Sequence, residues 1–109
     1  MALPDVIHVT VTADDIRHGQ SGSWWNDPIA RSLQRQLGLG HLVESQQYVL
    51  RIFHDRHCHH YTVPSIANQF LVAFDADPQA DHAPFSFELT RYIGGAFEIV
   101  DDMSTPRRA

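Results

Sequence analysis

The chain has 109 residues, a formal net charge of −5 and one cysteine, and 43% of its residues are hydrophobic. Its length suits a single domain, and its balance of hydrophobic and charged residues excludes an intrinsically disordered protein. One thiol excludes an intramolecular disulfide, and no apolar run approaches the ~18 residues of a membrane span. Because the first residues also lack the pattern of a signal peptide, we expect one cytoplasmic domain over residues 1–109, with a frayed tail from about residue 101.

The N-terminal segment predicts a strand followed by a short helix. Residues 6–12 are mostly β-branched, which favours a strand. Thr12 is a candidate N-cap, because Asp15 follows three positions later and acidic side chains occupy the first turn. Gly19 is expected to end this helix.

A loop with two adjacent tryptophans leads into the second helix. Residues 20–26 contain Trp24 and Trp25. Asp27 followed by Pro28 predicts a helix start, since an acidic N-cap and a proline at the first helical position are both favoured there. Apolar side chains four positions apart form one stripe along this helix: Ile29, Leu33 and Leu37, beside Ala30.

Two strands are predicted in the middle of the chain, at residues 47–53 and 61–63. Alternation divides the first strand into two faces: Tyr48, Leu50 and Ile52 on one, and Val49, Arg51 and Phe53 on the other. The polar segment 54–60 is expected to be the hairpin loop between them.

The C-terminal half predicts a second long helix and at least one more strand. Pro64 and Ser65 open the helix, whose inner face is predicted to carry Ile66, Phe70 and Phe74, with Ala67 and Leu71 adjacent. Residues 75–84 read as a polar loop and residues 85–89 as a half-buried strand. Residues 92–100 are either a bulged strand or a loop followed by a strand. The whole pattern predicts an α+β domain, with a small mixed, mostly antiparallel sheet packed against two main helices.

Five segments carry a resemblance to a known group of proteins. Val-Thr-Val-Thr-Ala-Asp-Asp-Ile-Arg-His-Gly at 9–19 is followed by Asp-Pro-Ile-Ala-Arg-Ser-Leu at 27–33, Tyr-Thr-Val-Pro at 61–64, Phe-Leu-Val-Ala-Phe-Asp at 70–75 and Pro-Phe-Ser-Phe-Glu-Leu at 84–89. Over residues 6–89 the chain resembles small uncharacterised proteins of actinobacterial phages and prophages. Members often carry cysteines where this chain has Trp-Trp-Asn-Asp at 24–27, so no cysteine-based metal or redox role transfers. The resemblance implies an accessory phage protein, a class that includes many inhibitors of host defence.

A cluster of potential metal ligands lies in the predicted hairpin loop: His54, His57, Cys58, His59 and His60. Imidazole and thiolate are natural zinc ligands. In an extended segment, however, His57 and His59 share one face while Cys58 and His60 share the other, so the ligands converge only if the chain turns sharply. We therefore expect a solvated loop, with no cofactor and no specific metal. The alternatives are a transition-metal site and a histidine proton switch.

The candidates for partner binding are aromatic and acidic: Trp24, Trp25, Asp14, Asp15, Asp75 and Asp77. We expect one tryptophan to pack under the second helix and the other to be an exposed anchor, the kind of residue that dominates interface hot spots. Helix capping explains Asp14 and Asp15 better than paired catalytic carboxylates do, because adjacent side chains point in different directions.

The sequence predicts a binding protein and not an enzyme. It contains no nucleophile elbow, phosphate-binding glycine loop or His-Glu-x-x-His motif. Only Arg107 and Arg108 are locally basic, which disfavours direct binding to nucleic acid. We expect an anti-CRISPR-like inhibitor that binds stoichiometrically to a host defence protein with a basic nucleic-acid-binding surface. The alternatives are a sponge for a signalling nucleotide, which needs arginines that converge on phosphates, and a small metal-binding accessory protein.

Overall fold

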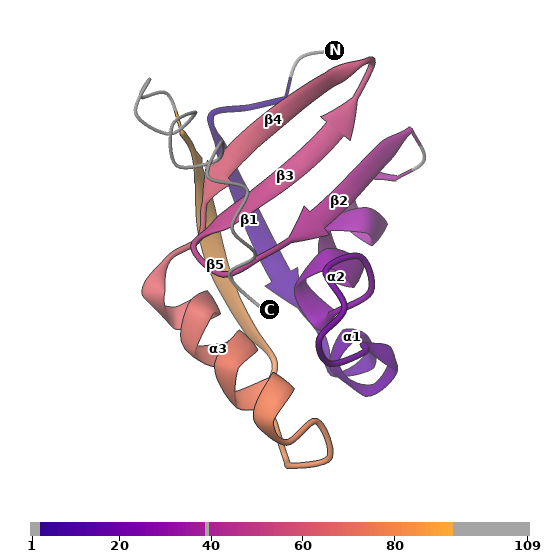
Figure 1. The fold of residues 1–109 in the computed structure, drawn as a ribbon, viewed down its shortest axis with the longest axis vertical. Helices are drawn as coiled ribbons and strands as arrows, with labels where there is room; N and C mark the ends of the chain where they lie inside the picture. Colours follow the sequence, from indigo (N-terminus) through magenta and orange to yellow (C-terminus); the bar gives the residue numbers. More distant parts are fainter. Residues whose placement is uncertain (1–2, 39, 93–109) are drawn as a thin grey trace.

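The computed structural model describes residues 3–38 and 40–92. Within them the elements follow in the order β1 (Val6–Val11), α1 (Ala13–His18), α2 (Pro28–Leu37), β2 (His41–Ser45), β3 (Val49–His54), β4 (His57–Thr62), α3 (Ser65–Ala76) and β5 (Phe85–Arg91). The strands form one sheet in the order β1-β5-β4-β3-β2 (Figure 1), and each described pairing is antiparallel. The predicted α+β domain with a mostly antiparallel sheet is confirmed.

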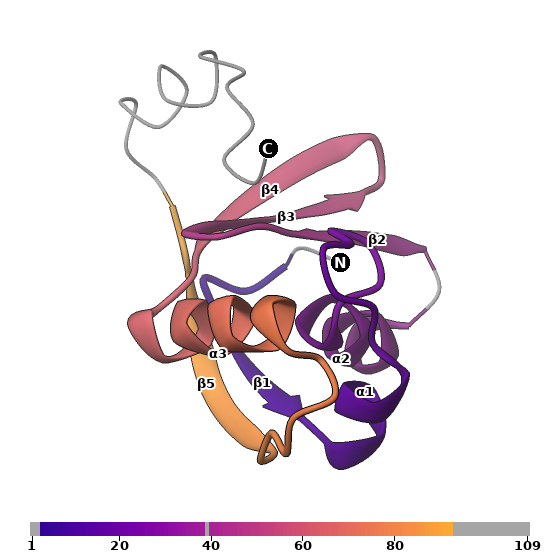
Figure 2. The ribbon, with the colours of Figure 1, turned by 60° about the horizontal axis from the view of Figure 1, so that its bottom comes forward.

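The sheet bends sharply between β4 and β5. β1 and β5 pair along their whole length, whereas the described pairing of β4 with β5 is confined to Tyr61 with Arg91 and Thr62 with Thr90. Figure 2 shows the result: β2, β3 and β4 form one wing, β1 and β5 form the other, and α2 and α3 lie on the concave side. The bend lets one small sheet enclose a core on its own inner face.

The hydrophobic core lies between this concave face and the two longer helices. Its strand residues are fully or almost fully buried and include Val9, Val11, Leu50, Ile52, Tyr61 and Leu89. The helices contribute Ile29, Leu33, Ala67, Leu71 and Phe74. Burying each large aliphatic or aromatic side chain stabilises the fold by roughly 1.5–3 kcal/mol. The predicted burial of Leu33 and Phe74 is confirmed, whereas Leu37 and Phe70 are only partly buried.

The predicted helix starts are confirmed by their capping geometry. The Thr12 hydroxyl accepts from the Asp15 amide at 3.1 Å, and the Asp15 carboxylate accepts from the Thr12 amide at 2.9 Å, which completes a capping box at α1. At α2, the Asp27 carboxylate accepts from the Ala30 amide at 2.8 Å and Pro28 is the first helical residue.

Helix α2 makes side-chain hydrogen bonds to the backbone of both outer strands. The side-chain amide of Gln36 donates to the His8 carbonyl and accepts from the Thr10 amide, each at 2.9 Å, as a neighbouring strand would. On the other side of the helix, the Gln34 amide donates to the His41 carbonyl at the start of β2. An uncovered strand edge is a template for aggregation, so Gln36 of α2 protects part of the edge of β1.

The sequence analysis missed one strand and placed the start of another too late. β2 lies in a segment for which no strand was predicted, and the predicted hairpin loop at 54–60 is mostly strand, because β4 begins at His57. The turn consists only of Asp55 and Arg56, whose φ angles of 52° and 66° are both positive. Positive φ at both central residues is the geometry of the tight type I′ hairpin turn. Cross-strand pairing therefore extends through histidines that were read as loop residues.

Two predicted side-chain orientations are also wrong. On α3 the buried stripe is Ala67, Leu71 and Phe74, and Ile66 is 52% exposed. Tyr48 lies before β3 and does not share a face with Leu50 and Ile52, because its φ of 69° turns it out of the strand. α3 also extends to Ala76, beyond the predicted start of the polar loop.

The predicted strand at 85–89 is confirmed, since β5 covers it. The predicted element at 92–100, apart from its first residue, and the predicted frayed tail lie outside the described residues. Within residues 3–38 and 40–92, no helix combines the length and the apolar character needed to cross a bilayer.

Candidate protein-binding surface

The loop that carries the two tryptophans is fixed at several points. Its backbone closes on itself through the Gln20 amide, which donates to the Asn26 carbonyl at 2.9 Å. The Ser45 amide of β2 donates to the Trp24 carbonyl at 2.7 Å, and the Gly22 amide donates to the Asp75 carboxylate of α3 at 2.9 Å. The loop is thus tied to the sheet and to α3, and the side chains that it presents are held in place before any partner arrives.

The two tryptophans lie in different environments. Trp24 is partly buried, whereas Trp25 is 44% exposed. The Trp25 ring lies against Phe53 of β3, with ring centroids 6.3 Å apart. Phe53 pairs across the strands with Leu42, which is 52% exposed. The guanidinium of Arg51 lies 5.8 Å from the centroid of the Phe53 ring. We call Trp25, Leu42, Arg51 and Phe53 the Trp25 surface.

An ion pair fixes Arg51 of the Trp25 surface, and the cysteine lies next to Phe53. Arg51 forms an ion pair with Glu44, whose side chain is almost fully buried, and its Nε donates to the Glu44 carboxylate at 2.6 Å. Cys58 is the cross-strand neighbour of Phe53 on the side away from Leu42, and its thiol is exposed. The only cysteine of the chain therefore lies at the margin of the Trp25 surface.

A cavity of about 270 Å³ adjoins Trp25 between α1, α2 and the tryptophan loop. Its lining is polar apart from the indole and comprises Asp14, Asp15, Asn26, Arg31, Gln34 and Arg35. The cavity thus brings together three of the predicted partner-binding residues, Asp14, Asp15 and Trp25. It also brings two arginines from successive turns of α2 into the same lining as the aromatic ring.

Only one of the two aspartates in this cavity is presented to solvent. Asp14 is exposed, with His18 3.2 Å from its carboxylate. Asp15 is 3% exposed and receives a hydrogen bond of 2.8 Å from Arg35. Burial raises the pKa of Asp15, but the hydrogen bonds from Arg35 and Thr12 outweigh burial and hold that pKa below its ordinary value. Asp15 therefore holds α1 on α2 as a carboxylate.

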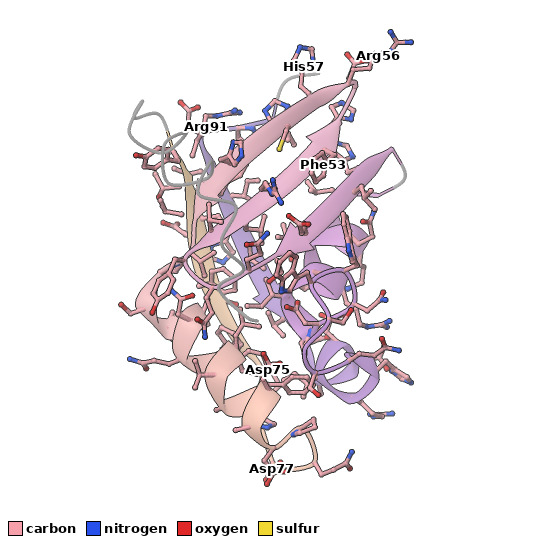
Figure 3. All side chains as sticks on the ribbon, viewed as in Figure 1. Phe53, Arg56, His57, Asp75, Asp77 and Arg91 are labelled. Atoms are coloured by element: carbon pink, nitrogen blue, oxygen red, sulfur yellow. The ribbon has the colours of Figure 1, made fainter. Side chains whose placement is uncertain are left out.

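The other two predicted acidic residues lie at the C-terminal end of α3 (Figure 3). Asp75 holds the tryptophan loop through the Gly22 amide. Asp77 is exposed, and its carboxylate accepts from the Gln79 amide at 3.2 Å in the turn that follows the helix. The four aspartates predicted to bind a partner are therefore divided between two places, and Asp15 and Asp75 make structural contacts.

The histidine cluster is spread over two faces of a hairpin. As expected for an extended segment, His57 and His59 face one side, where their ring centroids are 6.3 Å apart. Cys58 and His60 face the other, with Sγ 3.8 Å from Nε2. Figure 3 shows His57 beside Arg56 at the tip of the hairpin. In the described part of the chain, no three His, Cys, Asp or Glu side chains are grouped so that they could hold a metal ion.

The surroundings of His59 lower the pKa of its imidazole. Burial lowers its pKa, and the positive charge of Arg91 lowers it further. The Arg91 guanidinium lies 3.0 Å from His59 Nδ1, so this nitrogen accepts when the imidazole is neutral. Arg91 also donates to the Leu3 carbonyl and to the Asp5 carboxylate. These contacts attach the N-terminal segment to the junction of β4 and β5.

Three residues near Trp25 and the histidine cluster were not identified as candidates from the sequence. Phe53 meets Trp25 only in the folded protein, and Leu42 joins this surface because β2 pairs with β3. His41, at the start of β2, stacks on His54 with centroids 4.0 Å apart and planes inclined by 9°. Residues 42–45 read Leu-Val-Glu-Ser, which does not alternate apolar with polar side chains, so the sequence carries no period-two signal for this strand.

Comparison of the chain with protein-family models, with curated proteins and with solved structures finds no match.

Proposed function

We propose that this protein binds another protein stoichiometrically through the Trp25 surface. The observation that carries the proposal is the indole of Trp25, which is 44% exposed on a loop tied to β2 and α3. A large apolar ring held in water by a fixed backbone gains most when a partner covers it. Tryptophan and arginine are the residues most enriched at the energetic centres of interfaces, and both belong to this surface.

Preorganisation favours affinity at this surface. A partner that binds a mobile loop must offset the entropy lost when the loop is ordered. Here the Trp24 carbonyl and the Gly22 amide are already bonded to other elements. Arg51 is likewise held by Glu44. Most of the conformational entropy of these residues is therefore lost when the protein folds, and little more is lost when a partner binds.

The proposed partner is a host defence protein with a basic nucleic-acid-binding surface, which the inhibitor blocks as an anti-CRISPR protein does. Two observations support this choice. The chain has a formal net charge of −5, and such a field raises the rate of encounter with a basic surface. The exposed carboxylate of Asp14 lies in the same cavity lining as Trp25, where it can take the place of a phosphate beside a stacked base.

Quantitative capture from an actinobacterial lysate tests the proposal. Wild-type protein is expected to retain one partner near 1:1 stoichiometry, and Trp25→Ala is expected to lose it. Val6→Ala is the matched control, because Val6 is an exposed hydrophobic residue of β1 that lies outside the Trp25 surface. If the wild type, Trp25→Ala and the control variant all retain the same proteins, a role for Trp25 in binding is refuted. A captured partner that does not bind nucleic acid would refute the choice of partner while leaving the surface intact.

One observation favours a second candidate, the nucleotide sponge. The structure places Arg31 and Arg35 in one cavity with Trp25, which is an aromatic ring on which a base can stack. Against it, Arg35 is already paired with Asp15, and Asp14 would repel a phosphate. Titration calorimetry with mono-, di- and cyclic dinucleotides distinguishes the two functions. Micromolar binding that is lost in Arg31→Gln would favour the sponge, and no detectable binding would remove it.

A further inference from the structure

The outer face of α3 is unusual for a helix on the surface of an acidic protein. It has no charged residue from Ser65 to Phe74. Ile66 is 52% exposed and Val72 is 53% exposed. A helix that faces only solvent normally carries charged residues on that side, so this face has the composition of a surface that is covered.

Tyr48 extends the same apolar face from the loop before β3. Its side chain is 63% exposed and its φ is 69°, in the left-handed region that non-glycine residues rarely adopt. The Asn68 side chain of α3 accepts from the Tyr48 amide at 2.7 Å, and the Tyr48 carbonyl accepts from the Val63 amide at 3.0 Å. The backbone is thus held in a strained conformation that keeps a phenol ring in water beside α3.

A groove of about 320 Å³ lies between Tyr48 and α3. Its lining contains no charged residue and consists of Gln47, Tyr48, Asn68, Gln69, Val72 and Ala73. We call Tyr48, Ile66, Gln69, Val72 and Ala73 the α3 face. It shares no residue with the Trp25 surface.

The charge at the C-terminal end of α3 is the reverse of the usual arrangement, and the N-terminal end carries no charge. The N-cap is Pro64, which supplies no side-chain hydrogen bond, and the first turn contains no acidic residue. Asp75 and Asp77 lie at the C-terminal end, where the last turn contains no basic residue. Because the helix dipole favours anions at the N-terminus and cations at the C-terminus, the isolated helix has unfavourable electrostatics at one end and an unused positive end at the other.

We propose that the α3 face binds a second copy of this chain, with the two α3 helices antiparallel about a two-fold axis. In that arrangement Asp75 and Asp77 of each copy lie near the uncapped N-terminus of α3 in the other copy. The aspartates of each copy then lie near the positive end of the helix dipole of the other copy. The two-fold symmetry forms this favourable contact at both ends of the interface. A parallel arrangement would instead bring the aspartates of the two copies together.

The exposed positions of α3 are compatible with such an axis. If it passes between residues 70 and 71, Ser65 faces Ala76 of the second copy and Gln69 faces its Val72, so exposed positions meet exposed positions. Ala73 and Ala76 are small enough to let the two backbones approach closely. The groove beside Tyr48 then receives apolar side chains of the second copy.

Net charge favours a second copy at this face over other faces of the molecule. Two chains of charge −5 repel each other, and self-association is least opposed where no charge lies at the centre of the contact. A basic partner would form no ion pairs with the uncharged middle of the α3 face. A second copy avoids repulsion between like charges there. Self-association is separate from the function proposed for the Trp25 surface.

Sedimentation velocity of the full chain over a wide range of protein concentration tests the proposal. We expect a reversible dimer of twice the 12.4 kDa chain mass. Val72→Asp places a carboxylate at the centre of the contact and should raise the dimer Kd more than about tenfold. Val6→Asp is the matched control, since Val6 is 48% exposed on β1, and its dimer Kd should stay at the wild-type value.

Substitution of Ser65 tests the antiparallel orientation, because it is expected to change the stability of the monomer and the affinity of the dimer in opposite directions. Ser65→Asp adds an anion at the helix N-terminus, so the monomer should become harder to unfold while the dimer becomes weaker. Ser65→Lys should do the reverse, because a cation there meets Asp75 and Asp77 of the second copy. A purely structural role for Ser65 would not separate the two readouts in this way.

Two results would overturn self-association through the α3 face, and a third would overturn its antiparallel orientation. A monomer at every concentration up to the solubility limit would exclude the second copy, even if the α3 face bound another protein. A dimer with the same Kd in wild type and Val72→Asp would place self-association on another face. If Val72→Asp is monomeric but Ser65→Asp and Ser65→Lys shift the Kd in the same direction, the antiparallel orientation is wrong.

Discussion

The indole of Trp25 lies against the ring of Phe53, with centroids 6.3 Å apart and planes inclined by 30°. The contact joins the tryptophan loop to the third strand and makes one aromatic surface from two distant parts of the chain. It also orients the exposed side of the indole, because the buried side is fixed by Phe53. The Trp25 surface is therefore a property of the tertiary fold.

The position of Cys58 gives a direct report on occupancy of this surface. Its thiol is exposed and its cross-strand neighbour is Phe53. A partner that covers the Trp25 surface should slow alkylation of Cys58 at least about fivefold, because the reagent cannot reach the thiol. Mass spectrometry of the intact chain measures the rate, since only one residue reacts. Equal alkylation rates with and without saturating partner would place the interface elsewhere.

Gln36 is expected to stabilise the protein from the surface of α2. It makes two hydrogen bonds of 2.9 Å to the backbone of β1, each worth about 0.5–1.5 kcal/mol. Gln36→Ala should lower the free energy of unfolding by about 1 kcal/mol, after a small gain in helix propensity, and should increase aggregation. Gln79→Ala, in an exposed turn, is the control and should cost less than about 0.5 kcal/mol. Equal effects of the two substitutions in urea unfolding would contradict edge protection by Gln36.

The pair Asp15 and Arg35 predicts a pH-dependent contribution to stability. The folded-state pKa of Asp15 is lowered, so the folded state binds the proton less readily than the unfolded state. The contribution is therefore full above the unfolded pKa of about 4 and is lost as pH falls through the folded pKa. Asp15→Asn should reduce the free energy of unfolding by about 1 kcal/mol at pH 7.

Urea unfolding of wild type and Asp15→Asn at pH 7, 5, 4 and 3 measures this difference. The difference should shrink below pH 4. Asp14→Asn is the control, because Asp14 is exposed and its ion pair with His18 should contribute little. A difference between wild type and Asp15→Asn that is as large at pH 3 as at pH 7 would show that the carboxylate charge is not involved.

Tyr48 is predicted to reduce the stability of the monomer. A non-glycine residue in the left-handed region costs roughly 1 kcal/mol, and the side chain buries little surface in return. Asparagine tolerates this conformation, so Tyr48→Asn should raise the free energy of unfolding by about 0.5–1 kcal/mol when measured at low protein concentration. Tyr48→Phe keeps the strain and should not change it. Destabilisation by Tyr48→Asn of 2 kcal/mol or more would show that the phenol ring has a core role.

Elements with strong local signals were predicted correctly from the sequence. Thr12 and Asp15 specify the start of α1, and Asp27 with Pro28 specifies the start of α2, because capping depends on residues within one turn. The strand that became β5 was identified by the alternation of its apolar residues. These signals do not depend on what the element packs against.

The errors arose where pairing between distant segments decides the structure. Three of the six residues of β4 are histidines, and the strand is stabilised by its pairing with β3, which local polarity does not reveal. On α3, Ile66 and Ala67 are adjacent, and only the position of the sheet decides which of the two is buried. The Trp25 surface was predicted in part: the exposed tryptophan was expected, but Leu42 and Phe53 join it through the sheet.

The central claim, a partner steered by charge and anchored by Trp25, is tested most directly by surface-based binding kinetics at several salt concentrations with the captured partner. The on-rate of the wild type should fall as salt rises, because exposed charges are screened over ~8–10 Å at physiological ionic strength. Trp25→Ala should raise the off-rate more than about tenfold without changing the salt slope, and Asp14→Asn should reduce the slope without changing the off-rate. Binding that is indifferent both to salt and to Trp25→Ala would contradict the account.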